Sequence, residues 1–571
     1  ILSNRVTPFT GPDLHLLTDG MAVLNKYLPA WGVVLALILL GFFALLLLIL
    51  LIKAPKYKRK VKFRYDLLLV VIGVALFAGA TQLALEKRVL SNYFGNIAFA
   101  YEDYGYPYCL AVTIFDTGIS CPRDYSDKEI TRIEKTEDNL PATNEDSKPN
   151  IIFVQLESFF DPTLVEYLNI SEDPIPNFRK LMKEYSSGYY KVPSVGAGTA
   201  NTEFESITGM SLHYFGPGEY PYKSILKETT CESAPYVLKN LGYSTHAVHN
   251  NEANFYGRRS IFPNLGFDTF TSAEYMSEEE DKNPLGWTKD EILTDEIIKC
   301  LDSTEESDYI YTISTQGHGA YPEEQLIDDP EITVSGAETE AQNNQWEYYC
   351  NEIHEMDDFV KELTDALADY PEDVILVMYG DHLPTMGLTV EDLKNKYLFQ
   401  TQYVMWDNFG LEKKNENLAA YQMAAEVMDR AGIHEGTIFR YHQARRNTRN
   451  YQVDLETLQY DVLYGKKYSY DGESPFQRTK MRMGLYDVTL DSMEEVSTVD
   501  HTYRLKGTNF TPSSQVKLNG DWYDTVYVNP TTLMISGKEI NDFDRVSVVQ
   551  RSNSSTRKAL SKSYDRSAYM L

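Results

Sequence analysis

The sequence predicts an α/β protein with N-terminal transmembrane helices, a doubly wound central domain and a small C-terminal β-sandwich. Three observations support this prediction. Long uncharged runs of apolar residues lie within the first 90 positions. From Asn150, short β-rich runs alternate with helical stretches, which is typical of a parallel sheet. Beyond Leu485, strand patterns and turn signals follow one another without helical segments. A chain of 571 residues is also longer than one ordinary domain.

The composition excludes two broad classes of function. The net charge is -30, and no basic stripe could replace phosphate counterions, so we expect no nucleic-acid partner. The five cysteines show neither CxxC pairs nor zinc-finger spacing, which argues against a disulfide framework or a thiolate metal site. They still allow one bridge in an exported domain. These cysteines are Cys109, Cys121, Cys231, Cys300 and Cys350.

The membrane region is predicted at residues 1–85, with two transmembrane helices at about 33–52 and 67–85. Val33–Ile52 contains no polar side chain, and its length at about 1.5 Å per residue matches the roughly 30 Å of bilayer hydrocarbon. The run 67–85 is interrupted only by Thr81 and Gln82. A buried core helix or a signal segment is the alternative for either run, and the length and uniformity of the first argue against both.

The charge between the two runs predicts their orientation. Lys53–Arg64 reads KAPKYKRKVKFR, with seven basic residues and no acid, and short loops of this kind stay on the cytoplasmic side. Everything after about Glu86 should then be extracellular. Residues before Pro29 should lie outside too, which predicts further spans upstream and a multi-pass protein of the cell membrane. Residues 86–148 are expected to form a juxtamembrane helical segment and a linker.

The catalytic domain is predicted at residues 149–467. Polar residues capable of chemistry follow four β-rich runs, and ligands bind at the carboxyl ends of strands in open α/β sheets. We therefore expect these residues to meet at one edge of the sheet. The runs are 151–156, 244–248, 309–313 and 374–379, and the residues that follow them are Glu157, His249, His318, Asp381 and His382.

Residues 485–555 are predicted to form a separate small domain. RLKGTNFTPSSQVKLNG and the later TLMISGKEI and DRVSVVQ alternate in the manner of strands. The GTNF turn and this alternation resemble the IPT/TIG type of immunoglobulin-like β-sandwich.

Glu157 and the Asp381-His382 pair are the candidate metal ligands. Carboxylate oxygens and an imidazole suit a hard or borderline divalent cation, and Gly380 permits a sharp turn before the pair. Each feature has an ordinary alternative. Glu157 could cap a helix or face solvent, and an Asp-His dipeptide is common.

SVGAGTANTEFESITGM supplies the candidate nucleophile. A helix is predicted to begin at Thr199, after Gly196 and Gly198, and to stop near Gly209. Helix N-termini present free N–H groups and partial positive charge, which suits a phosphate. Thr199 could be an ordinary N-cap, and Thr202 is a rival nucleophile that local sequence does not separate from it.

Four motifs resemble those of lipoteichoic acid synthases and related phosphoglycerol transferases in their order and approximate spacing. They are LESFF, GAGTANTEF, TQGHGAY and YGDHLP. That family belongs to the alkaline phosphatase–sulfatase superfamily, and the similarity extends to about residue 467. The resemblance implies that Thr199, and not Thr202, is the nucleophile. It also implies a metal site of Glu157, Thr199, Asp381 and His382.

HNNEANFYGRR resembles the head-group pocket of the same family. The resemblance implies that His249 and Arg258 contact the substrate phosphate. It gives the same contact to His318, which is also expected to be catalytic. Tyr256 stands where lipoteichoic acid synthase has a tryptophan, which puts the shape of the glycerol pocket in question.

The implied activity is a membrane-anchored, extracellular phosphoglycerol transferase that uses one divalent ion, with Mn²⁺ preferred and Mg²⁺ or Zn²⁺ as alternatives. It would move glycerol phosphate from phosphatidylglycerol to a glycerol-phosphate polymer, a glycolipid or a glycan through a phospho-threonine intermediate. The alternatives are phosphoethanolamine transfer, a sulfatase-like phosphodiester hydrolase and a non-catalytic cell-envelope binding protein.

Overall fold

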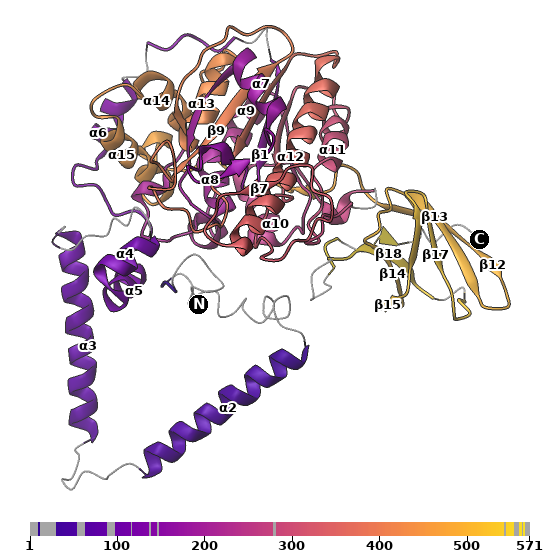
Figure 1. Cartoon of the computed structure of the whole chain (residues 1–571), viewed down its shortest axis with the longest axis horizontal. Helices are drawn as coiled ribbons and strands as arrows, with labels where there is room; N and C mark the ends of the chain where they lie inside the picture. Colours follow the sequence, from indigo (N-terminus) through magenta and orange to yellow (C-terminus); the bar gives the residue numbers. More distant parts are fainter. Residues whose placement is uncertain are drawn as a thin grey trace. The chain divides into compact units, whose positions relative to one another are not determined.

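The structure is a computed structural model. It describes residues 9–11, 30–53, 63–87, 89, 97–115, 117–135, 139–144, 148–277, 281–541, 544–552, 559–561 and 564–565. The chain divides into two compact units (Figure 1). The first unit holds the residues up to Ser120 together with Tyr214–Glu219, and nearly all the rest of the chain forms the second.

The first unit is helical. It contains α2 (Ala30–Lys53), α3 (Phe63–Glu86), α4 (Ile97–Tyr104) and α5 (Tyr106–Phe115). Within the described residues one stretch, Phe63–Leu85, is long and apolar enough to cross a bilayer by length and composition, which agrees with the second predicted span. The apolar stretch Gly41–Leu50 in α2 is shorter. The first span and the multi-pass arrangement therefore stay predictions.

The second unit is built on a nine-stranded mixed sheet with the order β10-β3-β9-β8-β1-β6-β4-β5-β11. The four predicted strands are adjacent and parallel at its centre. The strands are β1 (Asn150–Leu156), β3 (Ser186–Lys191), β4 (Ser244–His249), β5 (Thr269–Ser272), β6 (Asp308–Ile313), β8 (Val374–Gly380), β9 (Gln400–Asp407), β10 (Leu418–Ala419) and β11 (Arg482–Met483).

Alternate side chains of the central strands point to opposite faces of this sheet. On one face, Ile152, Val154 and Leu376 belong to a large apolar core with Trp346 and Ile353 of the long helix α12. The opposite face is aromatic and packs toward α8. The helices of this unit are α6 (Asp127–Glu134), α7 (Pro176–Glu184), α8 (Thr199–Thr208), α9 (Ala234–Asn240), α10 (Arg258–Ile261), α11 (Ile292–Leu301), α12 (Glu340–Ala368), α13 (Ala420–Arg430), α14 (Thr437–Arg445) and α15 (Tyr451–Leu463).

Contacts on the aromatic face connect the sheet directly to α8. The Phe153 ring lies 6.0 Å from Tyr311 and 6.5 Å from Tyr379. Tyr190 pairs with Ser206 of α8 at 2.8 Å, and Gln155 Nε2 donates to the Thr199 carbonyl at 3.1 Å. These contacts fix the position of the α8 N-terminus relative to the carboxyl ends of the strands.

The C-terminal segment forms two four-stranded antiparallel sheets, β12-β13-β17-β16 and β15-β14-β18-β19, which share one apolar core. Leu505 and Leu533 of the first sheet meet Val516 and Val548 of the second in that core. The IPT/TIG assignment stays a prediction. The strands are β12 (Thr489–Ser497), β13 (Thr502–Thr508), β14 (Ser514–Leu518), β15 (Asp521–Tyr523), β16 (Val526–Asn529), β17 (Thr532–Ile535), β18 (Val546–Gln550) and β19 (Tyr564–Asp565).

Two features differ from the sequence-based expectation. The large sheet takes its ninth strand, β11, from beyond Lys467, where a domain boundary was expected. All five cysteines are free thiols, four of them buried, so the one bridge that the sequence allowed is absent.

Candidate active site

Three predicted metal ligands converge at the carboxyl ends of β1 and β8. Glu157 follows β1, and Asp381 and His382 follow β8, its parallel neighbour. One ligand atom from each lies within 4.8 Å of the others, and all three side chains are buried. Parallel register explains the meeting, because adjacent parallel strands end at the same edge of the sheet.

Tight turns bring these ligands together. Ser158 has a left-handed φ of 53°, and its N–H donates to Asp381 Oδ1 at 2.8 Å. The Glu157 N–H donates to Ser314 Oγ at 2.9 Å, which ties the turn after β1 to the end of β6. A Cβ at Gly380 would collide with the Phe159 carbonyl, so the close approach of the two turns requires glycine there.

The donor set fits a divalent cation. Asp381 Oδ2 and His382 Nε2 are buried without a hydrogen-bond partner among the described residues. His382 Nε2 lies 3.4 Å from Asp381 Oδ2 and 3.7 Å from Glu157 Oε1. Burial raises the pKa of Asp381 well above its usual range, and the neighbouring Glu157 carboxylate adds to the effect. A cation among these atoms would relieve that repulsion and supply the missing partner.

The two candidate threonines occupy different places. Thr199 begins α8, and its Oγ1 donates to Glu157 Oε2 at 3.0 Å, within the ligand cluster. Thr202, three residues later, donates its hydroxyl to the Asp381 backbone carbonyl at 2.8 Å. Thr202 therefore supports the turn after β8, and Thr199 is the hydroxyl that the geometry brings to the ligands.

Arg258 contacts His249 and also Glu203, a residue that the sequence analysis did not single out. Arg258 Nε donates to Glu203 Oε1 and Oε2 at 3.2 and 3.0 Å, and neither side chain is exposed. Arg258 Nη1 donates to His249 Nε2 at 2.9 Å. Because a guanidinium only donates, His249 is neutral and carries its proton on Nδ1, which donates to the Ile313 carbonyl at 2.9 Å.

These hydrogen bonds restrict the roles that His249 and Arg258 can have in binding a substrate. Burial lowers the pKa of His249 well below its usual range, and the charge of Arg258 adds to this. Both ring nitrogens of His249 are engaged, so the histidine positions Arg258 in this structure. The Glu203 carboxylate balances the charge of Arg258, which leaves the arginine as a hydrogen-bond donor more than as a net positive charge.

His318 and Tyr256 lie among other aromatic rings. His318 Nδ1 donates to the Gly319 carbonyl at 2.5 Å, which leaves Nε2 as its other polar atom. Its ring is 4.5 Å from Trp287 and 6.3 Å from Phe255. The Tyr256 ring lies 5.0 Å from Phe255, and its backbone has a left-handed φ of 53°.

Sequence reasoning missed three of these partners. Glu203 lies inside TANTEF, but nothing local marks it as the partner of an arginine 55 positions away. Trp287 and Phe255 reach His318 only through the packing of separate loops. The one signal that the sequence offered was the position of Phe255 directly before the candidate residue Tyr256.

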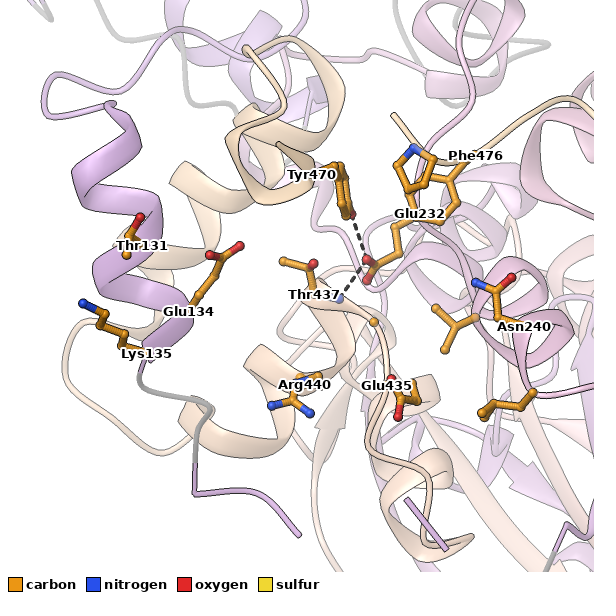
Figure 2. A pocket seen from close by; sticks show the side chains of 14 residues that line it. Thr131, Glu134, Lys135, Glu232, Asn240, Glu435, Thr437, Arg440, Tyr470 and Phe476 are labelled. Carbon is orange, nitrogen blue, oxygen red and sulfur yellow. Dashed lines mark hydrogen bonds between the residues drawn. The ribbon is translucent and has the colours of Figure 1, made fainter. Parts of the chain in front are cut away.

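A cavity of about 860 Å³ lies elsewhere in this unit, lined by α6, α9, α14 and the segment around Tyr470 (Figure 2). Its buried carboxylate, Glu232, accepts the N–H groups of Thr437 and Ile438 at 2.8 and 2.7 Å and the Tyr470 hydroxyl at 2.8 Å. Glu232 thus caps α14 and is fully hydrogen-bonded. The cavity shares no lining residue with the metal-ligand cluster.

Known proteins share this domain. Residues 149–433 match the family model Sulfatase. A protein of Rhizobium meliloti (strain 1021), whose name assigns it to cyclic β-1,2-glucan modification, is 28% identical over 65% of this chain and 63% of its own length. Lipoteichoic acid synthase 1 of Bacillus subtilis (strain 168) is 26% identical over 59% of this chain and 54% of its own. The chain thus spans less than two thirds of these relatives.

A solved structure shares the fold. The Streptococcus pyogenes phosphoglycerol transferase GacH, in complex with sn-glycerol-1-phosphate, superimposes with a TM-score of 0.55 at 23% identity. The match covers 63% of this chain and 100% of that one. Residues 149–433 of this chain therefore form a sulfatase domain of the alkaline phosphatase superfamily.

Proposed function

We propose that this protein is a membrane-anchored phosphoglycerol transferase that moves glycerol phosphate from phosphatidylglycerol to an acceptor hydroxyl through phospho-Thr199. The observation that carries the proposal is the meeting of Thr199 Oγ1 with Glu157, Asp381 and His382 at the start of α8. A helix N-terminus that begins with the nucleophile favours a phosphoryl group at that position.

Glu157, Asp381, His382 and Thr199 would hold one divalent ion, with Mn²⁺ or Mg²⁺ suited to the oxygen-rich set and Zn²⁺ as an alternative. When bound, such an ion lowers the pKa of a hydroxyl and stabilises developing negative charge. Ser158 and Ser314 orient the ligands through the backbone turns described above. Thr202 supports the Asp381 carbonyl and takes no part in bond making.

The reaction proceeds in two displacements at phosphorus. The Thr199 oxygen forms a bond to the lipid phosphorus, the bond from phosphorus to the diacylglycerol oxygen breaks, and that oxygen takes the hydroxyl proton. An acceptor hydroxyl then bonds to the same phosphorus, the Thr199–phosphorus bond breaks, and Thr199 regains a proton. Arg258 donates to the head group, and His318 contacts the phosphate oxygens.

The acceptor and the location are parts of the same proposal. The similarity to a glucan modification protein and to a lipoteichoic acid synthase supports a glycan or a glycerol-phosphate polymer as acceptor. The basic segment before the apolar stretch Phe63–Leu85 supports an extracellular catalytic domain. An anchor of this kind keeps the site near the lipid donor and raises its effective concentration.

Purified protein with Mn²⁺ and vesicles of phosphatidylglycerol tests the proposal. We expect release of diacylglycerol and, by mass spectrometry, a glycerophosphoryl group on Thr199. Vesicles of phosphatidylethanolamine should give neither product. Turnover of phosphatidylethanolamine alone would favour the phosphoethanolamine alternative. Hydrolysis without an adduct on Thr199 would favour a plain phosphodiesterase.

A further inference from the structure

Five half-buried rings form a continuous aromatic row next to the proposed phosphate site. In order, these are Trp287, His318, Phe255, Tyr256 and Tyr220. Neighbouring ring centroids are separated by 4.5 Å, 6.3 Å, 5.0 Å and 6.2 Å along the row. Aromatic pairs at such separations attract one another. The rings meet tilted or edge to face at the first three contacts and are stacked only between Tyr256 and Tyr220, so they hold one another in place without forming one flat face.

Several features hold this row in place. The backbone N–H of Trp287 donates to Asn283 Oδ1 at 2.9 Å, and Asn283 Nδ2 donates to the Gln316 carbonyl at 3.2 Å, two residues before His318. Tyr256 keeps a left-handed backbone, which is unusual for a bulky residue and directs its ring between Phe255 and Tyr220. The loops that carry Trp287 and His318 are thus fixed to each other.

The row passes beside the proposed phosphate site. His318, its second ring, belongs to the proposed phosphate contacts. The backbone just before His318 packs against the turn that carries Glu157, since a Cβ at Gly317 would lie 2.2 Å from the Glu157 carbonyl oxygen. Lys223 Nζ lies 4.6 Å from the Tyr220 ring and 5.4 Å from the Tyr256 ring, at the far end of the row.

We propose that the aromatic row binds sugar rings of the acceptor, and that the acceptor is therefore a saccharide hydroxyl. This inference rests on the proposed transferase function. The C–H face of a pyranose is flat and apolar, and it matches the face of an aromatic ring, while the sugar hydroxyls remain free for polar partners. A glycerol-phosphate polymer has no such face, so it could engage only the two cations that lie against the row within the described residues, Lys223 and Arg258.

The test measures how the phospho-Thr199 intermediate divides between saccharide and water. Protein, Mn²⁺ and phosphatidylglycerol vesicles are incubated with a panel of gluco-, manno-, rhamno- and N-acetylglucosamine oligosaccharides. The readout is the ratio of glycerophosphoryl-saccharide to free glycerol phosphate. Both products arise from the same intermediate, so an effect of a variant on the donor step cancels in the ratio.

We expect Trp287→Ala and Tyr220→Leu to lower this ratio about ten-fold. Trp287→Phe and Tyr220→Phe keep a ring and should restore most of it. Trp522→Ala, which removes a half-exposed tryptophan outside the row, should leave the ratio unchanged.

Two results would overturn the saccharide inference and leave the proposed transferase function intact. One is diacylglycerol release with the same product ratio in wild type, Trp287→Ala and Tyr220→Leu. The other is transfer to glycerol-phosphate oligomers with no saccharide product. If wild type releases no diacylglycerol from phosphatidylglycerol, the proposed function fails first and the saccharide inference fails with it.

Discussion

Arg258 and Glu203 form an ion pair in which neither side chain is exposed to solvent, although 55 residues separate them along the chain. Glu203 lies one helical turn after Thr199 on α8. The helix that begins with the proposed nucleophile therefore also holds the arginine proposed for the head group. A buried pair of this kind is sensitive to loss of either partner.

Glu203→Gln should weaken donor binding more than it slows chemistry. The amide leaves the Arg258 charge uncompensated, which we expect to lower the free energy of unfolding by about 3 to 5 kcal/mol. Because Arg258 loses its fixed position, KM for phosphatidylglycerol should rise about ten-fold or more, with a smaller change in kcat. Steady-state kinetics and denaturant unfolding measure the two effects.

Glu205→Gln is the matched control for that variant. Glu205 is also buried on α8, but it accepts the Leu212 N–H at 2.8 Å and lies away from Arg258. Burial raises its pKa to about 8, so much of it is already protonated near neutral pH. Its amide should leave KM within about two-fold of wild type. Equal KM changes in the two variants would show that Glu203 has no special role in positioning Arg258.

Thr199→Ala should abolish transfer, and Thr202→Ser should not. Removal of a nucleophile typically lowers kcat by at least about a thousand-fold, whereas serine at 202 keeps the hydroxyl that donates to the Asp381 carbonyl. Rates of diacylglycerol release and mass spectrometry of the adduct report both variants. An adduct that persists in Thr199→Ala, or that maps to Thr202, would show that a residue other than Thr199 is the nucleophile.

Asp381→Asn should weaken cation binding without unfolding the protein. The amide keeps an oxygen that can accept the Ser158 N–H, but it removes one of the two charges that face the proposed ion. We expect Mn²⁺ affinity to fall at least about ten-fold in titration calorimetry. Thr202→Ser serves again as the control, with wild-type affinity. Unchanged Mn²⁺ binding in Asp381→Asn would place the cation elsewhere.

His442 should make the protein less stable as the pH falls below 6.5. Burial lowers its pKa from 6.5 to about 4, with Nε2 donating to the Gly209 carbonyl and Nδ1 accepting from the Tyr451 hydroxyl, both at 2.7 Å. The unfolded chain takes up the proton first, so stability is complete above pH 6.5 and declines toward pH 4. The loss from this group approaches about 3 kcal/mol.

Urea unfolding at several pH values between 4.5 and 7.5 measures this effect. His442→Gln removes the titrating group, so its free energy of unfolding should fall less with acidification than that of wild type. Parallel pH profiles for the two proteins would rule out the assignment to His442.

Cys121 offers a test of orientation. It is the exposed cysteine of the five and follows the apolar stretch Phe63–Leu85 in the chain. If the catalytic domain is extracellular, a membrane-impermeant maleimide should label intact cells through Cys121, and Cys121→Ser should lose the label. Labelling only after the cells are opened would reverse the predicted topology.

The sequence predicted the centre of the fold because buried parallel strands are nearly continuous apolar runs. IIFVQL and VILVMY became β1 and β8 at almost the expected bounds. The antiparallel pair β3 and β9 was missed. SSGYYK has little apolar character, and its pairing depends on QTQYVMWD more than 200 residues later. Such a strand is defined by its partner, which local patterns do not contain.

The candidate site was predictable where a side chain with a proposed chemical role directly follows a strand. Glu157, Asp381 and His382 meet because β1 and β8 are adjacent, and adjacency of these strands was the one assumption required. The difference between Thr199 and Thr202 was not predictable from local sequence, since both lie on the first turn of one helix. The roles of His249 and Arg258 depend on Glu203, so only the packed structure shows that the histidine is already engaged.

Strand β11 has a practical consequence for anyone who wants the sulfatase domain alone. An expression fragment that stops at Lys467 would lack Arg482 and Met483 and would leave the backbone of β5 unpaired along its outer side. Exposed strand edges recruit other chains, so such a fragment should self-associate. A fragment that extends past Gly484 keeps the edge covered, and size-exclusion profiles of the two would show the difference.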